Sequence, residues 1–213
     1  MRKALMLVLG LAVMGDAATA LAAETIALSS EWNEVGEQPD RCAPGLTGGG
    51  QKPKWVIVDT DGKLGIAETS ADTTDYRFPL CIVDGLSLSD LDVSVRFRPV
   101  AGKVDQAGGI AVRVKDARNY YVVRANALED NVRLYTVIDG DRRQFAGANV
   151  KVASQKWHTL RLRVVGDRFA VFFDGSPLFE ATERRIGGPG RVALWSKADS
   201  VTQFVDLAID PLP

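Results

Sequence analysis

Short runs of apolar or alternating residues recur from Trp55 almost to the end of the chain, and this periodicity constrains the fold more than any other feature. Gly, Asp, Asn and Pro residues separate the runs, and no window sustains a helical period. Val93, Val95 and Phe97, for instance, alternate with polar residues, as in a strand with one buried face. The pattern predicts an all-β chain with strands over residues 55–59, 64–68, 77–83, 92–98, 109–115, 120–125, 132–138, 159–165, 169–173, 191–195 and 204–209.

Two antiparallel sheets packed face to face are the simplest arrangement in which this many half-buried strands share a core. Gly166-Asp167 and Asp174-Gly175 are turn sequences that suit tight hairpins between neighbouring strands. No linker, internal repeat or low-complexity segment interrupts the pattern. We therefore expect a single domain over residues 23–213.

The first 22 residues have the character of a secretory signal peptide. Arg2 and Lys3 precede an apolar run over residues 4–14, and small residues follow it. The run is too short to cross a membrane, which takes about 20 apolar residues. We expect cleavage before Ala23 or Glu24 and export to the periplasm or the exterior.

The charge balance excludes several classes of partner. The chain has 26 Lys and Arg residues against 27 Asp and Glu residues, a formal net charge of −1. This balance argues against nucleic acid and against an anionic membrane surface as partners. One histidine and two cysteines also exclude most zinc sites. We expect a monomer whose partner is a carbohydrate or another polar small ligand.

An exported chain with two cysteines favours a disulfide between Cys42 and Cys81, because thiol pairs persist as disulfides in oxidising compartments. The alternative is two buried free thiols that behave as small apolar side chains. The segment over residues 42–50 is rich in turn residues, so we expect the bridge to hold a loop that packing alone would not.

Six sequence segments carry a family resemblance. Residues 157–164, 166–169 and 173–175 resemble the laminin G-like and concanavalin A-like lectin/glucanase superfamily. Residues 108–113, 119–121 and 190–195 are similar to its exported bacterial branch of 3-keto-disaccharide hydrolase-like proteins. The resemblance implies an antiparallel jelly-roll sandwich whose bent sheet has a concave face, on which related proteins bind or cut glycans.

Catalytic residues do not carry over from that resemblance. Glucanases of this fold place acidic residues alternately on one strand, and the chain has no such motif: Glu129 and Asp130 are adjacent and would point apart. His158 follows Trp157 at a strand entrance, where the superfamily uses the pair structurally. We therefore expect binding without catalysis. The alternatives are a glycoside-active enzyme of the 3-keto-disaccharide hydrolase-like group and an envelope scaffold with no small ligand.

Candidate ligand-binding residues concentrate between residues 103 and 135, with a second segment near Trp195. Alternation places Arg113 opposite Val112 and Val114, and Arg124 beside Asn126, so that arginines of neighbouring strands converge on one exposed face. The alternative is a solvated face on which the arginines pair with Asp116, Glu129 or Asp130. The predicted binding residues are Asp105, Gln106, Arg113, Arg124, Asn126, Arg133, Tyr135, Trp195 and Lys197.

No cofactor is expected. Calcium is the one alternative, because relatives of this fold hold it with loop oxygens. Its candidate ligands are Asp105, Asp116 and Asp199, although the chain has no clustered acidic calcium loop.

Overall fold

The computed structural model describes residues 26–27 and 34–213, and the predicted signal peptide lies outside them. Within this part, fifteen strands and no helix are found, so the all-β prediction is confirmed. None of the described segments is a helix with the length and apolar character needed to cross a membrane. The strands are β1 (Ile26–Ala27), β2 (Cys42–Gly48), β3 (Trp55–Asp59), β4 (Leu64–Glu68), β5 (Arg77–Val83), β6 (Leu91–Ala101), β7 (Ala107–Asp116), β8 (Asn119–Asn126), β9 (Asn131–Ile138), β10 (Asp141–Asn149), β11 (His158–Val165), β12 (Arg168–Phe173), β13 (Ser176–Thr182), β14 (Arg191–Ser196) and β15 (Val201–Pro211).

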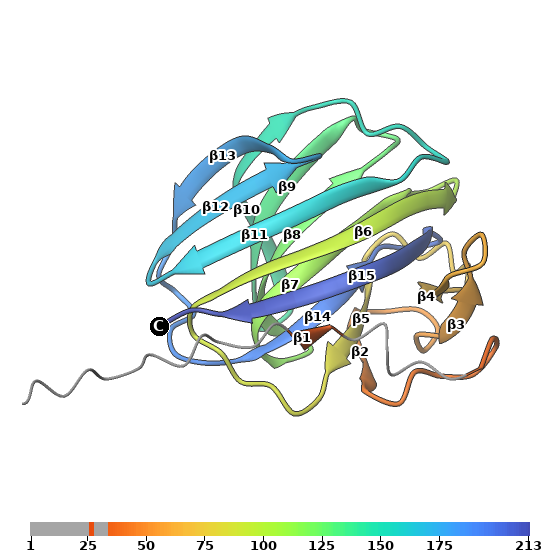
Figure 1. Ribbon diagram of the computed structural model, residues 1–213, viewed down its shortest axis with the longest axis horizontal. Helices are drawn as coiled ribbons and strands as arrows, with labels where there is room; N and C mark the ends of the chain where they lie inside the picture. The colour runs from red at the N-terminus through yellow and green to blue at the C-terminus, as the bar shows by residue number, and fades with distance from the viewer. Residues whose placement is uncertain (1–25, 28–33) are drawn as a thin grey trace, which may run out of the picture.

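The strands form two antiparallel sheets that pack face to face (Figure 1). The eight-stranded sheet has the order β13-β12-β11-β6-β15-β4-β3, with β1 paired to β15 beside this path. The seven-stranded sheet has the order β10-β9-β8-β7-β14-β5-β2. Strand β14 lies between β5 and β7, so the chain returns to this sheet after forming every strand of the eight-stranded sheet except β15.

The main core lies between the sheets and follows the alternation read from the sequence. Val93, Val95 and Phe97 of β6 point inward and are at most 1% exposed, whereas Ser94 and Arg96 between them face outward. Leu160 and Leu162 of β11 do the same on the neighbouring strand. Burial of these apolar faces is the main favourable free-energy contribution to the sandwich.

The seven-stranded sheet also buries side chains on its outer face, because the sheet is strongly curved. Phe78, Tyr120 and Trp195 lie on that face and are fully buried. The Tyr120 hydroxyl lies 2.8 Å from the Thr47 hydroxyl of the edge strand β2. Tyr76, just before β5, donates to the carbonyl of Gly140 in the β9–β10 turn at 2.8 Å. The two margins of this sheet therefore approach each other over a concave face.

A β-bulge in β7 turns one side chain to a different face from the one predicted. The register of β7 with β8 shifts between Val112 and Asp116, and Arg113 has a φ of 49°. Val112 faces the core between the sheets, but Val114 packs in the cluster on the concave face instead of beside Val112. The prediction that Val112 and Val114 share a face is wrong, because the bulge inserts an extra residue and breaks the alternation.

The structure also contains strands that the sequence pattern did not predict. Residues 42–48 form β2, an edge strand paired with β5 over seven residues, although the sequence there reads as turns. Pro44 is compatible with this position because an edge strand does not need every amide donor. Strands β10 and β13 were also missed, and both lie at sheet margins.

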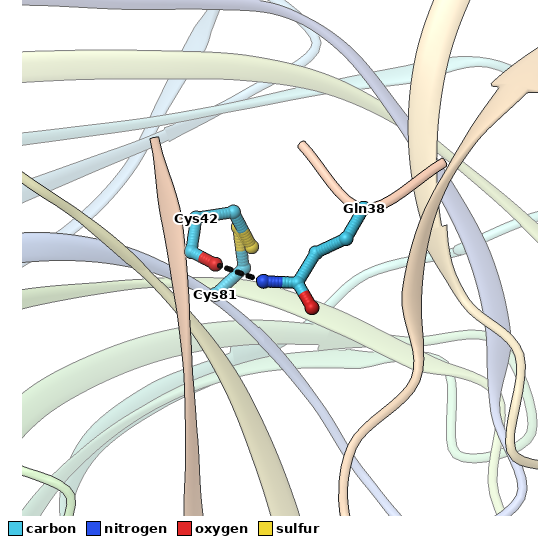
Figure 2. The surroundings of a disulfide bond; sticks show 3 residues. All are labelled: Gln38, Cys42 and Cys81. Atoms are coloured by element: carbon cyan, nitrogen blue, oxygen red, sulfur yellow. Dashed lines mark hydrogen bonds between the residues drawn. A yellow bond between two sulfur atoms is a disulfide. The ribbon is translucent and has the colours of Figure 1, made fainter. Parts of the chain in front are cut away.

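The predicted disulfide between Cys42 and Cys81 is confirmed. It joins β2 to the neighbouring strand β5, and both half-cystines are buried in the main core. Gln38 donates a hydrogen bond from its carboxamide to the Cys42 carbonyl at 3.4 Å (Figure 2). The bridge thus fixes an outermost strand to its sheet.

A buried ion pair connects the two sheets near the start of β5. The Arg77 guanidinium and the Glu68 carboxylate are fully buried, with Nη2 and Oε1 3.1 Å apart. Glu68 ends β4 of the eight-stranded sheet and Arg77 begins β5 of the seven-stranded sheet. Arg77 also donates to the carbonyls of Gln51 and Ala198, each at 3.0 Å.

Candidate ligand-binding face

The concave face of the seven-stranded sheet carries most of the predicted binding residues. Arg124 pairs directly with Gly109 on one side and with Arg133 on the other, so these positions share a face. Tyr135 pairs with Val122 on the same face of β8 and β9. Seven of the nine predicted residues gather at this end of the face: Asp105, Arg124, Asn126, Arg133, Tyr135, Trp195 and Lys197.

Lys197 and Asp105 form one half of the polar cluster. The Lys197 ammonium lies 2.7 Å from a carboxylate oxygen of Asp105 and 2.7 Å from one of Asp75. Asn126 donates to the other Asp105 oxygen at 2.6 Å. Burial raises the pKa of Asp105, and the hydrogen bond from Lys197 only partly opposes this effect.

Arg124 organises the other half of the cluster. Its guanidinium donates to Glu129 at 2.8 Å, to the Tyr135 hydroxyl at 3.0 Å, and to the Asn131 side-chain oxygen. Burial acts to raise the pKa of Glu129, but the hydrogen bond from Asn131 and the charge of Arg124 lower it overall. Two of the carboxyl groups on this face, Asp105 and Glu129, therefore have pKa values shifted in opposite directions.

Arg142 belongs to the same face and was not predicted. It pairs with Val137 across the β9–β10 turn, and its guanidinium lies 4.3 Å from the ring centroid of Phe78 and 4.5 Å from that of Tyr135. Guanidinium groups at such distances are attracted to aromatic faces. The signal for Arg142 was present in the sequence: counting outward from the Asp139-Gly140 turn places it opposite Val137.

Two buried guanidinium nitrogens on this face have no hydrogen-bond acceptor. In the described part of the chain, the buried side-chain polar atoms without a partner are Trp55 Nε1, Ser70 Oγ, Arg124 Nε and Arg142 Nη1. The two arginine atoms belong to side chains that both lie over the Tyr135 ring. Buried polar groups are nearly always hydrogen-bonded, so these two donors mark the place where the polar network of this face is incomplete.

Arg113 and Gln106 do not join the cluster. Arg113 donates to the Ser89 carbonyl at 3.1 Å and to the Ile186 carbonyl at 3.3 Å, in a region at the other end of β7. Gln106 donates to the Gly102 carbonyl and accepts from Ser154. The bulge in β7 redirects Arg113, and Gln106 precedes Ala107, which occupies the concave face.

The expectation of a solvent-exposed arginine face is also wrong. Arg113 is 5% exposed and Arg124 is 4% exposed, because backbone carbonyls and neighbouring side chains surround both guanidinium groups. Of the alternative pairings, the one between Arg124 and Glu129 is found. The ligand-binding role of these residues stays a prediction, whereas their part in the hydrogen-bond network is established by the geometry.

The three candidate calcium ligands are not brought together. Asp199 accepts hydrogen bonds from the backbone amides of Lys103 and Asp105, at 2.7 and 3.1 Å. Burial tends to raise the pKa of Asp199, but these amide donors lower it overall. Asp116 lies at the opposite end of β7 and binds Asn119. Among the described residues, no three His, Cys, Asp or Glu side chains are arranged as metal ligands.

His158 occupies a packed position. Its ring stacks on Phe173 with centroids 5.1 Å apart. Nδ1 lies 2.8 Å from a carboxylate oxygen of Asp174, and Nε2 lies 3.1 Å from the Ala153 carbonyl. Both ring nitrogens are thus engaged within the protein, in agreement with the structural role expected for this residue.

Comparisons with known proteins agree with this architecture. A family model described as the galactocerebrosidase C-terminal lectin domain matches residues 92–212, more than half of the chain. The search of curated proteins finds no match. Among solved structures, the carbohydrate-binding module CBM66 of Bacillus subtilis aligns with a TM-score of 0.64 at 20% identity, covering 80% of this chain and 97% of that one.

Two further structures share the fold. The β-glucanase of Bacillus licheniformis aligns with a TM-score of 0.57 at 12% identity, over 92% of this chain and 100% of the enzyme. The exoplasmic domain of VIP36, solved in a calcium- and mannose-bound form, aligns with a TM-score of 0.56 at 13% identity, over 87% of this chain and 89% of that one. The predicted concanavalin A-like jelly-roll sandwich is thereby confirmed.

Proposed function

Because the chain belongs to the family of the galactocerebrosidase C-terminal lectin domain, we propose that it binds a carbohydrate on its concave face without cleaving it. The observation that carries the proposal is the cluster of arginine, carboxylate and amide side chains around Tyr135, in which Arg124 Nε and Arg142 Nη1 remain without an acceptor. Sugar hydroxyl groups are acceptors as well as donors, so they can complement arginine and carboxylate groups held in one cluster.

The edge of the cluster is open to a ligand. Glu129 and Asp75 are exposed, and Arg133 is half-buried with one nitrogen bonded to Asn149 at 2.6 Å. A saccharide lying across these side chains would reach donors and acceptors whose positions are already fixed by the buried network behind them. Such preorganisation reduces the entropy that binding costs.

A glycan array followed by calorimetric titration of each hit tests the proposal. Arg133→Gln should weaken binding by about 5- to 150-fold, the equivalent of about 1 to 3 kcal/mol for a lost ligand hydrogen bond. Arg96→Gln is the matched control, because Arg96 lies on the outer face of the eight-stranded sheet. No glycan binding at all, or equal losses in both variants, would refute the assignment.

A glycoside-cleaving activity is the second candidate, favoured by one observation. The pKa of Asp105 is raised and that of Glu129 is lowered on one face, and opposed shifts of two carboxyl groups are typical of acid and base pairs. Product analysis of every glycan that binds decides between the candidates. Cleavage that disappears in Glu129→Gln favours the enzyme, and binding without products favours the module.

Export and a monomeric state complete the proposal. The disulfide supports an oxidising compartment, where such bonds persist. Intact-mass spectrometry of periplasmic or secreted material should give a chain that begins at Ala23 or Glu24. Light scattering on the same sample should give the mass of one chain.

A further inference from the structure

A second polar cleft lies at the opposite end of the sandwich from the polar cluster. One cavity of about 390 Å³ lies against Thr136, Ile138, Asp139, Asp141, Arg143 and Arg185. A second, of about 290 Å³, shares Ile138 and Arg185 with it, so the two adjoin. We call the pair the end cleft. Their sizes approach or fall within the range of about 300 to 1,000 Å³ that small-ligand sites occupy.

Arg185 stands between the two cavities and is held rigidly. Its Nε donates to Glu183 at 2.6 Å, and its Nη2 donates to the Thr136 hydroxyl at 3.0 Å. Glu183 is itself fixed by the hydroxyl of buried Tyr121, which accepts from the amide of Ile186 at 2.8 Å. Burial is the main cause that raises the pKa of Tyr121 to about 12, so this hydroxyl stays protonated. A guanidinium oriented in this way is a preorganised donor at the cleft.

The charges on the cleft wall balance. Lys115, Arg143 and Arg185 provide three cations, and Asp116, Asp139 and Asp141 provide three anions. The cleft therefore offers both donors and acceptors with no net charge, which gives no preference for a charged ligand. Part of its lining is apolar, since Ile138 and Ile186 belong to it.

We propose that the end cleft is a separate binding site for a neutral mono- or disaccharide. Sugar hydroxyl groups would pair with the charged donors and acceptors of the lining, and the C–H groups of the ring would pack against Ile138 and Ile186. The cleft goes beyond the binding face described above and does not depend on it. Asn119 begins β8 at the cleft and Asn126 ends β8 at the polar cluster, roughly 23 Å apart at the rise of an extended strand.

Two adjacent arginines show how one strand serves both sites. Arg142 of β10 points to the concave face, where it contacts Phe78 and Tyr135. Arg143, the next residue, lines the end cleft and bonds Asp141 at 2.7 Å. Successive side chains of a strand point to opposite faces, so the pair separates without any special backbone geometry.

The test is a nitrogen-15 NMR titration of the full mature chain. The probes are maltose, lactose and sucrose, with glucuronate and glucosamine as charged probes. The signals to follow are the side-chain Nε–H of Arg185 and Arg143 and the amide of Gly187, which lines the second cavity. We expect at least one neutral sugar to shift these signals in a saturable way.

Variants assign the site. Arg185→Gln and Arg143→Gln should each weaken that binding by at least about tenfold, as expected for a lost hydrogen bond to a ligand. Arg184→Gln is the matched control, because Arg184 is the exposed neighbour of Arg185 and does not line the cleft. Arg143 is 70% exposed at its side chain, so its variant keeps the test valid if Arg185→Gln destabilises the fold.

Each outcome bears on the inference. Saturable shifts that Arg143→Gln removes and Arg184→Gln retains support it. No shift with any neutral sugar, or shifts with the charged probes only, overturn it. If Arg133→Gln is the only variant that removes binding, the end-cleft inference is wrong and the proposed function stands. If binding occurs at the end cleft alone, the inference is supported and the assignment of the concave face is refuted.

Discussion

The ion pair between Arg77 and Glu68 should be the most costly single polar contact to break. Arg77→Met leaves the Glu68 carboxylate buried with only the amides of Lys54 and Ser70 as donors, at 2.9 and 3.3 Å. Breaking a buried pair from one side costs about 3 to 5 kcal/mol. The carbonyls of Gln51 and Ala198 lose a donor as well, so we expect the free energy of unfolding to fall by about 4 to 5 kcal/mol.

Replacement of both partners should cost much less than the sum of the single changes. In Arg77→Met with Glu68→Leu, no charge is left buried, and such double replacements are often close to neutral. Guanidinium denaturation of the four proteins of this cycle measures the coupling. Lys151→Ala, which breaks the exposed pair with Asp130, is the control and should cost less than about 1 kcal/mol. Additive single losses, or an Arg77→Met loss no larger than that of the control, would show that the pair does not connect the sheets as argued.

Three further predictions follow from buried or hydrogen-bonded groups. Replacing Cys42 and Cys81 with serine should lower the free energy of unfolding by about 4 kcal/mol, for a sequence separation of 39 residues, and a melting temperature unchanged by reductant would contradict this. Arg113→Gln should destabilise the fold by about 2 to 4 kcal/mol in chemical denaturation, because two carbonyls lose their donor. A variant as stable as the parent would show that the hydrogen bonds of Arg113 do not stabilise the fold. The pKa of Asp72 is lowered from 3.8 to about 2, mainly by the backbone N–H of Gln51. Its contribution to stability is therefore complete above about pH 4 and is lost as the pH falls toward 2. Asp72→Asn should remove this contribution from the acid side of a curve of stability against pH, and an unchanged curve would contradict the prediction.

The sequence predicted the strands that have one apolar and one polar face. Strands β4 and β5 match their predicted bounds as short apolar runs, because nearly all of their residues are buried. Strand β3 also matches, and β6, whose buried and outward residues alternate, extends a few residues beyond its prediction. Alternation is a reliable signal there because the core between the sheets selects it. The strands at the sheet margins lack that selection. Strand β10 has no fully buried residue, and the residues of β2 are typical of turns, although they pair with β5 as a strand.

The candidate site was predicted in part for the same reason. Arg124 and Asn126 share a face because β8 alternates regularly, and the structure places both in the cluster. Arg113 departs from it because the bulge depends on how β7 pairs with two neighbours, which no local pattern encodes. Arg142 approaches Phe78 only because the sheet curves until residues of distant strands meet, and curvature is a property of the whole sheet.

The margins of the two sheets have a consequence for how molecules pack side by side. Pro44 lies in β2 and Pro177 in β13, and each removes an amide donor from an outermost strand. In β10 the pairing register shifts between Gln144 and Ala146, which interrupts the third margin. At these three margins a neighbouring molecule would thus meet a broken row of donors. At the fourth margin, β3, Ile57 already exchanges backbone hydrogen bonds with Gly36 and Glu37 of the same chain. Both features oppose extension of the ladder from chain to chain. Copies of the chain bound close together on a carbohydrate would therefore meet without a continuous row of free backbone donors between them.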